Sequence, residues 1–190
     1  MHSKEEILAA TTTVFKKYGL RKNTLDDIVK ECGMKKTALY YYFKSKDEII
    51  QTMFKNDIQK LKMDVVNKVT VQKTATDKLY TYLVERTKSI RYMMKYFYLF
   101  IKDGVPSHYR ELALSERRKI LQEEIKFLQD IITDGINNGE FKDISKISVV
   151  YLLLGTTQNL GLEDLSYRKD MDIETEVRKI LDIILSGIKK

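Results

Sequence analysis

The stretch that decides the fold runs from Thr24 to Glu48 and reads TLDDIVKECGMKKTALYYYFKSKDE. It contains two short helical patterns with a glycine between them. Thr24 is a favoured N-cap residue, and Asp26 and Asp27 follow in the first helical turn, where the helix dipole stabilises acidic side chains. Gly33 stands where a tight turn between helices needs a residue without a side chain. The stretch therefore predicts a helix-turn-helix.

The second helical pattern, at about 35–43, has an apolar side and a polar side. At about 100° per residue, Leu39 and Phe43 fall together and predict an inward anchor. The opposite side carries hydroxyls, aromatic rings and a lysine. Tyrosine hydroxyls can donate to phosphate oxygens, and Lys36 can donate to a guanine edge or to phosphate, which the residue type alone does not separate. This helix is therefore expected to enter the major groove of double-stranded DNA.

Positive charge is concentrated around this motif. Between Lys16 and Lys46 lie nine Lys/Arg and three Asp/Glu residues, so this segment accounts for +6 of the net charge of +7. A basic patch of this kind is the footprint expected for contact with a polyphosphate. Charge alone is equally compatible with a solvated lysine-rich face, and it is the motif that favours DNA.

The rest of the 190-residue chain reads as helices. Leu, Ile, Lys, Glu and Asp dominate without two-residue alternation, and the single proline and eight glycines show no long flexible linker. A capping box at Ser3 starts the first helix, and Gly19 is expected to end it. His108 is expected in a loop beside Pro106. Further helices are expected from about residue 45 and at about 77–103, 115–138, 143–163 and 172–188. The sequence predicts an all-α fold.

Three segments resemble the N-terminal signature of TetR-family repressors. They are Thr24–Ile28, Cys32–Met34 and, above all, Leu39–Glu48, and the resemblance covers about residues 3–54. It implies a DNA-binding transcriptional regulator, by family habit a repressor, that binds a palindromic operator as a homodimer. The candidate DNA-binding residues are Thr24 and Tyr40 at phosphates, Lys36, Thr37 and Tyr41 at or near base edges, Lys46 at phosphate, and Lys35 and Tyr42 beside them.

Two positions depart from the family pattern. Relatives often carry a small-residue or Gly-Thr pair where this chain has Thr37-Ala38, so any base contact through a threonine at position 38 is lost. Some relatives carry an arginine that contacts DNA bases at the position equivalent to Leu25. The DNA sequence preference therefore cannot be copied from a relative.

The resemblance also implies two domains, a helix-turn-helix domain at 1–46 and a helical effector-binding and dimerisation domain at 47–190. The last two helices suit a dimer interface, because the 149–154 run is apolar almost all round and the final helix has a clean apolar face. Half-sites about 34 Å apart require paired recognition helices. Packing of both helices within one subunit is the alternative.

Aromatic residues are dense between Tyr80 and Tyr109. We take Tyr92, Tyr96 and Phe100 as candidate ligand-binding residues for an unknown small apolar or aromatic effector. Aromatic stripes at helical spacing are also common in cores, so both interpretations stay open. An effector would release DNA by favouring a conformation whose half-site spacing misfits the operator.

Other functions find little support in the residues. There is no glycine-rich phosphate loop, no Cys/His cluster and no paired nucleophile and base, and the adjacent Glu123 and Glu124 point in different directions on a helix. We therefore expect no catalytic residue, metal site or cofactor. No apolar run is long enough to span a membrane, the N-terminus is unlike a secretory signal, and the lone Cys32 can form no internal disulfide, so we expect a cytoplasmic protein without a membrane partner.

The alternative function is a helical adaptor that uses its basic module to bind an acidic protein or an anionic surface. The two functions differ in how binding depends on salt and on DNA sequence.

Overall fold

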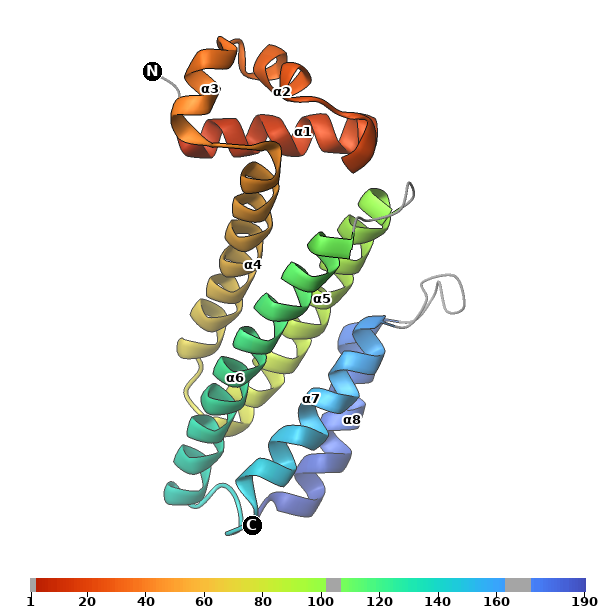
Figure 1. The fold of residues 1–190 in the computed structure, drawn as a ribbon. Helices are drawn as coiled ribbons and strands as arrows, with labels where there is room; N and C mark the ends of the chain where they lie inside the picture. The colour runs from red at the N-terminus through yellow and green to blue at the C-terminus, as the bar shows by residue number, and fades with distance from the viewer. Residues whose placement is uncertain (1–2, 102–106, 163–171) are drawn as a thin grey trace. The chain divides into compact units, whose positions relative to one another are not determined.

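The computed structural model describes residues 3–101, 107–162 and 172–190, and in this part of the chain every regular element is an α-helix (Figure 1). The all-α prediction is confirmed. The helices are α1 (Lys4–Lys22), α2 (Leu25–Cys32), α3 (Lys36–Tyr42), α4 (Lys46–Thr70), α5 (Ala75–Ile101), α6 (Ser107–Asn137), α7 (Lys146–Leu162) and α8 (Ile173–Ile188).

The chain divides into two compact units. The first comprises residues 1–60 and 95–116, and the second comprises residues 61–94 and 117–190. These units are defined by which residues pack together. The predicted border at residue 46 instead separates a DNA-binding domain from an effector-binding and dimerisation domain. That border stays a prediction.

The core of the first unit explains why three short N-terminal helices are stable. Leu39 and Phe43 are 1% and 2% exposed, as the predicted anchor requires. They join buried residues from α1, α2 and the start of α4, namely Ile7, Leu8, Val14, Phe15, Ile28, Ile49, Ile50 and Met53. Burial of such side chains is worth about 1.5–3 kcal/mol each, which stabilises helices too short to form alone.

One sequence expectation about helix ends is confirmed and one is corrected. Gly19 has a non-helical, left-handed backbone (φ 76°, ψ 171°) that interrupts the first helix as predicted, and a further helical turn then runs to Lys22. Glycine tolerates this conformation, and the side-chain amide of Asn23 donates to the Gly19 carbonyl, which holds the interrupted turn together. His108 lies in the first turn of α6 and not in a loop, because that helix begins at Ser107.

The second unit has its own core, built from α5 to α8 and the end of α4. Its largest fully buried side chains include Leu79, Leu83, Leu128 and Phe141. After α6 the chain turns at Gly139 (φ 78°). Beyond the turn, Lys142 N donates to the Ile188 carbonyl at 2.8 Å and Lys190 N donates to the Glu140 carbonyl at 3.3 Å. The end of α8 is thereby tied to the turn that follows α6.

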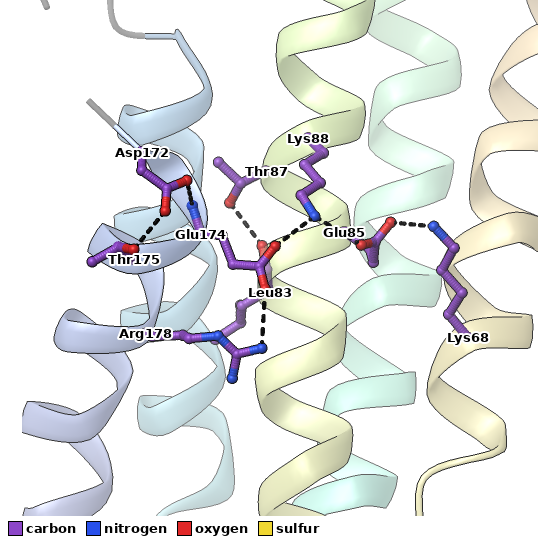
Figure 2. Close-up of polar contacts among 9 residues, drawn as sticks. All are labelled: Lys68, Leu83, Glu85, Thr87, Lys88, Asp172, Glu174, Thr175 and Arg178. Atoms are coloured by element: carbon purple, nitrogen blue, oxygen red, sulfur yellow. Dashed lines mark hydrogen bonds and ion pairs between the residues drawn. The ribbon is translucent and has the colours of Figure 1, made fainter. Parts of the chain in front are cut away.

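A chain of ion pairs joins α4, α5 and α8 (Figure 2). Lys68 lies 2.6 Å from Glu85, Lys88 lies 3.3 Å from Glu85 and 2.8 Å from Glu174, and Arg178 lies 3.1 Å from Glu174. Burial raises the pKa of Glu85, but the two lysines outweigh burial and the pKa is lowered. Most of these charges are exposed, so each pair adds little stability by itself.

Candidate nucleic-acid interface

Capping fixes both ends of α2. The Thr24 hydroxyl accepts from Asp27 N at 3.3 Å and donates to the Asp27 carboxylate at 2.8 Å, while Thr24 N donates to the same carboxylate at 2.7 Å. The Thr24 amide is the main reason why the pKa of Asp27 is lowered. At the other end Gly33 takes a left-handed conformation (φ 64°, ψ 31°). The Thr24 hydroxyl hydrogen is thus already used within the protein.

The outer face of α3 is rich in exposed aromatic and polar side chains. Tyr41 is 81% exposed and Tyr40 is 49% exposed, and Lys35, Lys36 and Thr37 are also exposed. Large aromatic side chains left this open to water are typical of a surface that binds a partner. The structure brings these five candidates together on one short helix whose other side holds the core.

Tyr42 differs from the other candidates. Its side chain is half-buried and packs against the N-terminal core, with its ring edge-on to that of Tyr41 at a centroid distance of 5.3 Å. This contact orients the Tyr41 ring. Tyr42 thus lies beside the exposed face and contacts Tyr41 on it. Any DNA contact by Tyr42 stays a prediction.

Lys36 and Lys46, both predicted to contact DNA, each form a polar contact within the first unit. Lys36 Nζ lies 2.9 Å from the Asp26 carboxylate, and the hydrogen bond to Asp26 raises the pKa of Lys36. Lys46 Nζ donates to the Asn23 carbonyl at 2.6 Å, and burial lowers the pKa of Lys46. Lys46 therefore joins the start of α4 to the connection between α1 and α2.

Asp26 is the residue of this surface that the sequence interpretation missed. The Leu25 side chain packs against the N-terminal core, so it does not point outward where a base-reading side chain would have to stand. The Asp26 side chain is 71% exposed and reaches Lys36 on the next helix. Helical periodicity carried the signal, since Ile28 and Leu25 share the inward side and Asp26 does not.

The candidate effector residues are only partly visible. Tyr92 is 54% exposed, while the side chains of Tyr96 and Phe100 lie outside the described part of the structure. A cavity between α5, α7 and α8 has a volume of about 10 Å³, roughly the space of one water molecule. It is lined by Leu83, Leu153, Thr156, Thr157, Val177, Ile180, Leu181 and Ile184. This cavity is too small for an organic effector.

A buried polar cluster lies beside that cavity, and sequence reasoning missed it. Arg86 donates from Nε to Glu124 at 2.7 Å and from Nη1 to Thr157 at 2.8 Å, and the Tyr82 hydroxyl donates to Glu124 at 2.8 Å. Burial and the neighbouring Glu124 raise the pKa of Tyr82 far above its ordinary value, so its hydroxyl remains a donor. Glu123 instead pairs with Lys62, which confirms that the two adjacent carboxylates point apart.

An exposed apolar strip lies on the last two helices. On α7 the exposed side chains are Ile147 (37%), Tyr151 (59%) and Leu152 (54%), and on α8 Ile183 is 72% exposed. Val150 and Leu153, on the opposite side of α7, are buried in the core of the second unit. The part of the 149–154 run that the subunit itself does not cover is therefore an apolar surface.

The described residues contain no group of three or more His, Cys, Asp or Glu side chains placed to hold a metal ion. Among the same residues, no helix combines the length and apolar character needed to cross a bilayer.

The N-terminal part of the chain matches a known family of proteins. Residues 7–53 match the model of the family described as bacterial regulatory proteins, tetR family. A fatty acid metabolism regulator protein of Bacillus subtilis is 23% identical over 189 residues, which span 96% of this chain and 94% of that protein.

Solved structures share the fold over nearly the whole chain. A transcriptional regulator of the TetR/AcrR family from Thermobifida fusca has a TM-score of 0.72 at 24% identity, covering 98% of each chain. FadR from Bacillus subtilis, solved in complex with stearoyl-CoA, has a TM-score of 0.67 at 19% identity, covering 98% of this chain and 100% of that one.

The helix-turn-helix and these similarities define a DNA-binding transcriptional regulator with an all-α fold. Residues 7–53 match the tetR family of bacterial regulatory proteins, and the similarities along the rest of the chain support a TetR-family transcriptional regulator.

Proposed function

We propose that the chain binds a palindromic operator as a homodimer, acts as a repressor, and releases DNA when a small effector binds. The observation that carries the DNA-binding part is the face of α3. Tyr40 and Tyr41 are strongly exposed on a helix anchored by buried Leu39 and Phe43. A recognition helix needs this division, because one side must stay fixed in its domain while the other enters the major groove.

The proposed phosphate contacts need small adjustments of the side chains described above. Thr24 has its hydroxyl hydrogen on Asp27, so its phosphate contact would use a rearranged hydroxyl. The ammonium group of Lys46 donates to Asn23 and has three hydrogens, so a phosphate can accept another of them. Tyr40, Lys35 and Thr37 are exposed, so their side chains are accessible to DNA.

The homodimer is supported by the exposed apolar strip of Ile147, Tyr151, Leu152 and Ile183. Exposed apolar side chains gathered on two adjacent helices favour burial against a second copy. A two-fold pair of α7 and α8 would form a four-helix bundle, and a palindromic operator requires such a two-fold pair of subunits.

The effector part rests on similarity and on the residues of the second half of the chain, 47–190. The related FadR structure contains stearoyl-CoA, a ligand with a long apolar chain. This agrees with an apolar effector for the present protein, with Tyr92, Tyr96 and Phe100 as candidate contacts.

Selection of bound duplexes from a random DNA pool, with the purified full-length protein, tests the proposed function. We expect enrichment of one palindrome, with affinity that falls steeply as salt rises. Tyr41→Ala is expected to weaken binding to that palindrome about 5- to 100-fold, the usual value of one specific contact. Val71→Ala shortens an exposed apolar side chain outside the proposed DNA, effector and dimer surfaces and serves as the control. Equal affinity for selected and random duplexes would contradict the operator proposal and favour the adaptor alternative.

A further inference from the structure

An acidic side chain stands on the surface that we propose faces DNA. Asp26 lies in the first turn of α2, is 71% exposed, and has its carboxylate 2.9 Å from Lys36 Nζ at the start of α3. The same exposed surface carries Thr37, Tyr40 and Tyr41. The surrounding segment is basic, so this carboxylate opposes the charge that would hold the protein to any duplex.

The ion pair has different consequences for two kinds of DNA contact. A phosphate can form an ion pair with Lys36 only in competition with the Asp26 carboxylate. Phosphates within a Debye length of about 8 Å also repel that carboxylate. A base edge in the groove carries no charge. Because an ammonium group has three donor hydrogens, Lys36 can keep Asp26 and still donate to a guanine acceptor.

We propose that Asp26 is a specificity-determining residue: through its ion pair with Lys36 it weakens binding to random DNA more than it weakens binding to the operator. The inference deepens the proposed function and rests on it. Binding to random DNA consists almost wholly of phosphate contacts, whereas operator binding adds base contacts. Because Asp26 weakens phosphate contact by Lys36, it raises the ratio of operator affinity to affinity for random DNA.

The test compares dissociation constants for the selected operator and for a random duplex across a series of salt concentrations. Asp26→Asn keeps the size of the side chain and removes its charge. We expect the affinity for random DNA to rise roughly two- to fivefold, the range given by an exposed ion pair. The salt dependence should steepen by about one phosphate contact, and the operator affinity should change less.

Two controls separate the ion pair from a general effect of charge. In a Lys36→Met background, Asp26→Asn should have little effect on the ratio, because the partner through which it acts is gone. Glu31→Gln removes an exposed acidic side chain from the same helix. We expect this variant to change the ratio less than Asp26→Asn does. Thermal melting of all variants checks that the first unit stays folded.

The possible outcomes distinguish this inference from the proposed function. An operator-to-random ratio that stays unchanged in Asp26→Asn, or changes equally with and without Lys36, would overturn the inference alone. Selective loss of operator binding in Asp26→Asn would also overturn it, because that result means direct contact of Asp26 with a base. A wild-type protein that binds every duplex equally would remove the proposed function, and the inference with it.

Discussion

The guanidinium group of Arg86 and the carboxylate of Glu124 form a two-point contact between α5 and α6, at 2.7 Å from Nε and 3.3 Å from Nη2. The side chains are only 8% and 18% exposed. Thr157 and Tyr82 supply further hydrogen bonds, so the buried charges are well satisfied. Breaking such a pair from one side leaves an uncompensated charge in the core.

We therefore expect Arg86→Met to lower the free energy of unfolding by about 3–5 kcal/mol, because the Glu124 carboxylate loses its counterion. The double variant Arg86→Met with Glu124→Leu should recover part of this loss, since apolar replacement of both partners is often tolerated. Chemical denaturation measures both. Arg178→Met, which breaks an exposed pair with Glu174, is the control and should cost about 1 kcal/mol or less. An Arg86→Met variant no less stable than this control would contradict the prediction.

Gly135 is required by close packing and not by backbone conformation. A Cβ atom at this position in α6 would overlap the ring of the fully buried Phe141 and lie 2.9 Å from Ala75 Cβ. We expect Gly135→Ala to destabilise the protein by about 1–3 kcal/mol despite the better helix propensity of alanine. Gly187→Ala is the matched control, because a Cβ there meets no atom within 4 Å. Denaturation midpoints compare them, and equal midpoints would show that Phe141 moves aside without cost.

Glu140 caps the start of α5 from a distant part of the chain. Its carboxylate accepts from Ala75 N at 2.9 Å and from Thr76 N at 3.1 Å. Burial raises the pKa of Glu140, but these two amides outweigh it and the pKa falls below the ordinary value of 4.5. We expect Glu140→Gln to cost about 1 kcal/mol at pH 7, as for other lost caps.

The pH dependence of this cost follows from linkage. A carboxyl group with a lowered folded-state pKa contributes stability above its unfolded pKa and loses it as the pH falls through the folded value. The difference in melting temperature between wild type and Glu140→Gln should therefore be constant near neutrality and shrink below about pH 4.5. A difference that persists at pH 2 would argue against the charge and for the shape of the side chain.

The apolar strip makes the dimer testable without DNA. Leu152→Lys together with Ile183→Lys should shift the protein to monomer in sedimentation, because two desolvated ammonium groups per subunit would enter the proposed interface. Both positions are more than half exposed in the single subunit, so its fold should survive. Lys substitution of Val71, an exposed apolar residue outside the strip, is the control. Retention of the dimer by the double variant would place the interface elsewhere.

Local patterns in the sequence were enough to predict much of the fold. The capping residues Ser3 and Thr24, the turn at Gly33 and the Leu39/Phe43 anchor depend on residues a few positions apart, and the structure confirms each. These features follow from backbone hydrogen bonding and helical period, which act over short separations.

Contacts between distant residues could not be predicted in this way. Arg86 and Glu124 are 38 positions apart, and in the sequence both look like members of a solvated helical face. The pairing of Asp26 with Lys36 depends on the angle between α2 and α3, which helical period alone does not give. The restart of α1 after Gly19 depends on the side chain of Asn23.

The connection between the end of α8 and the turn after α6 has a practical consequence for truncation of the chain. Lys190 bonds to the backbone of Glu140, and the Glu140 side chain holds the first amides of α5. Removal of Lys190 would therefore take away a hydrogen bond that holds the backbone of Glu140, and would weaken the support of the residue that caps α5.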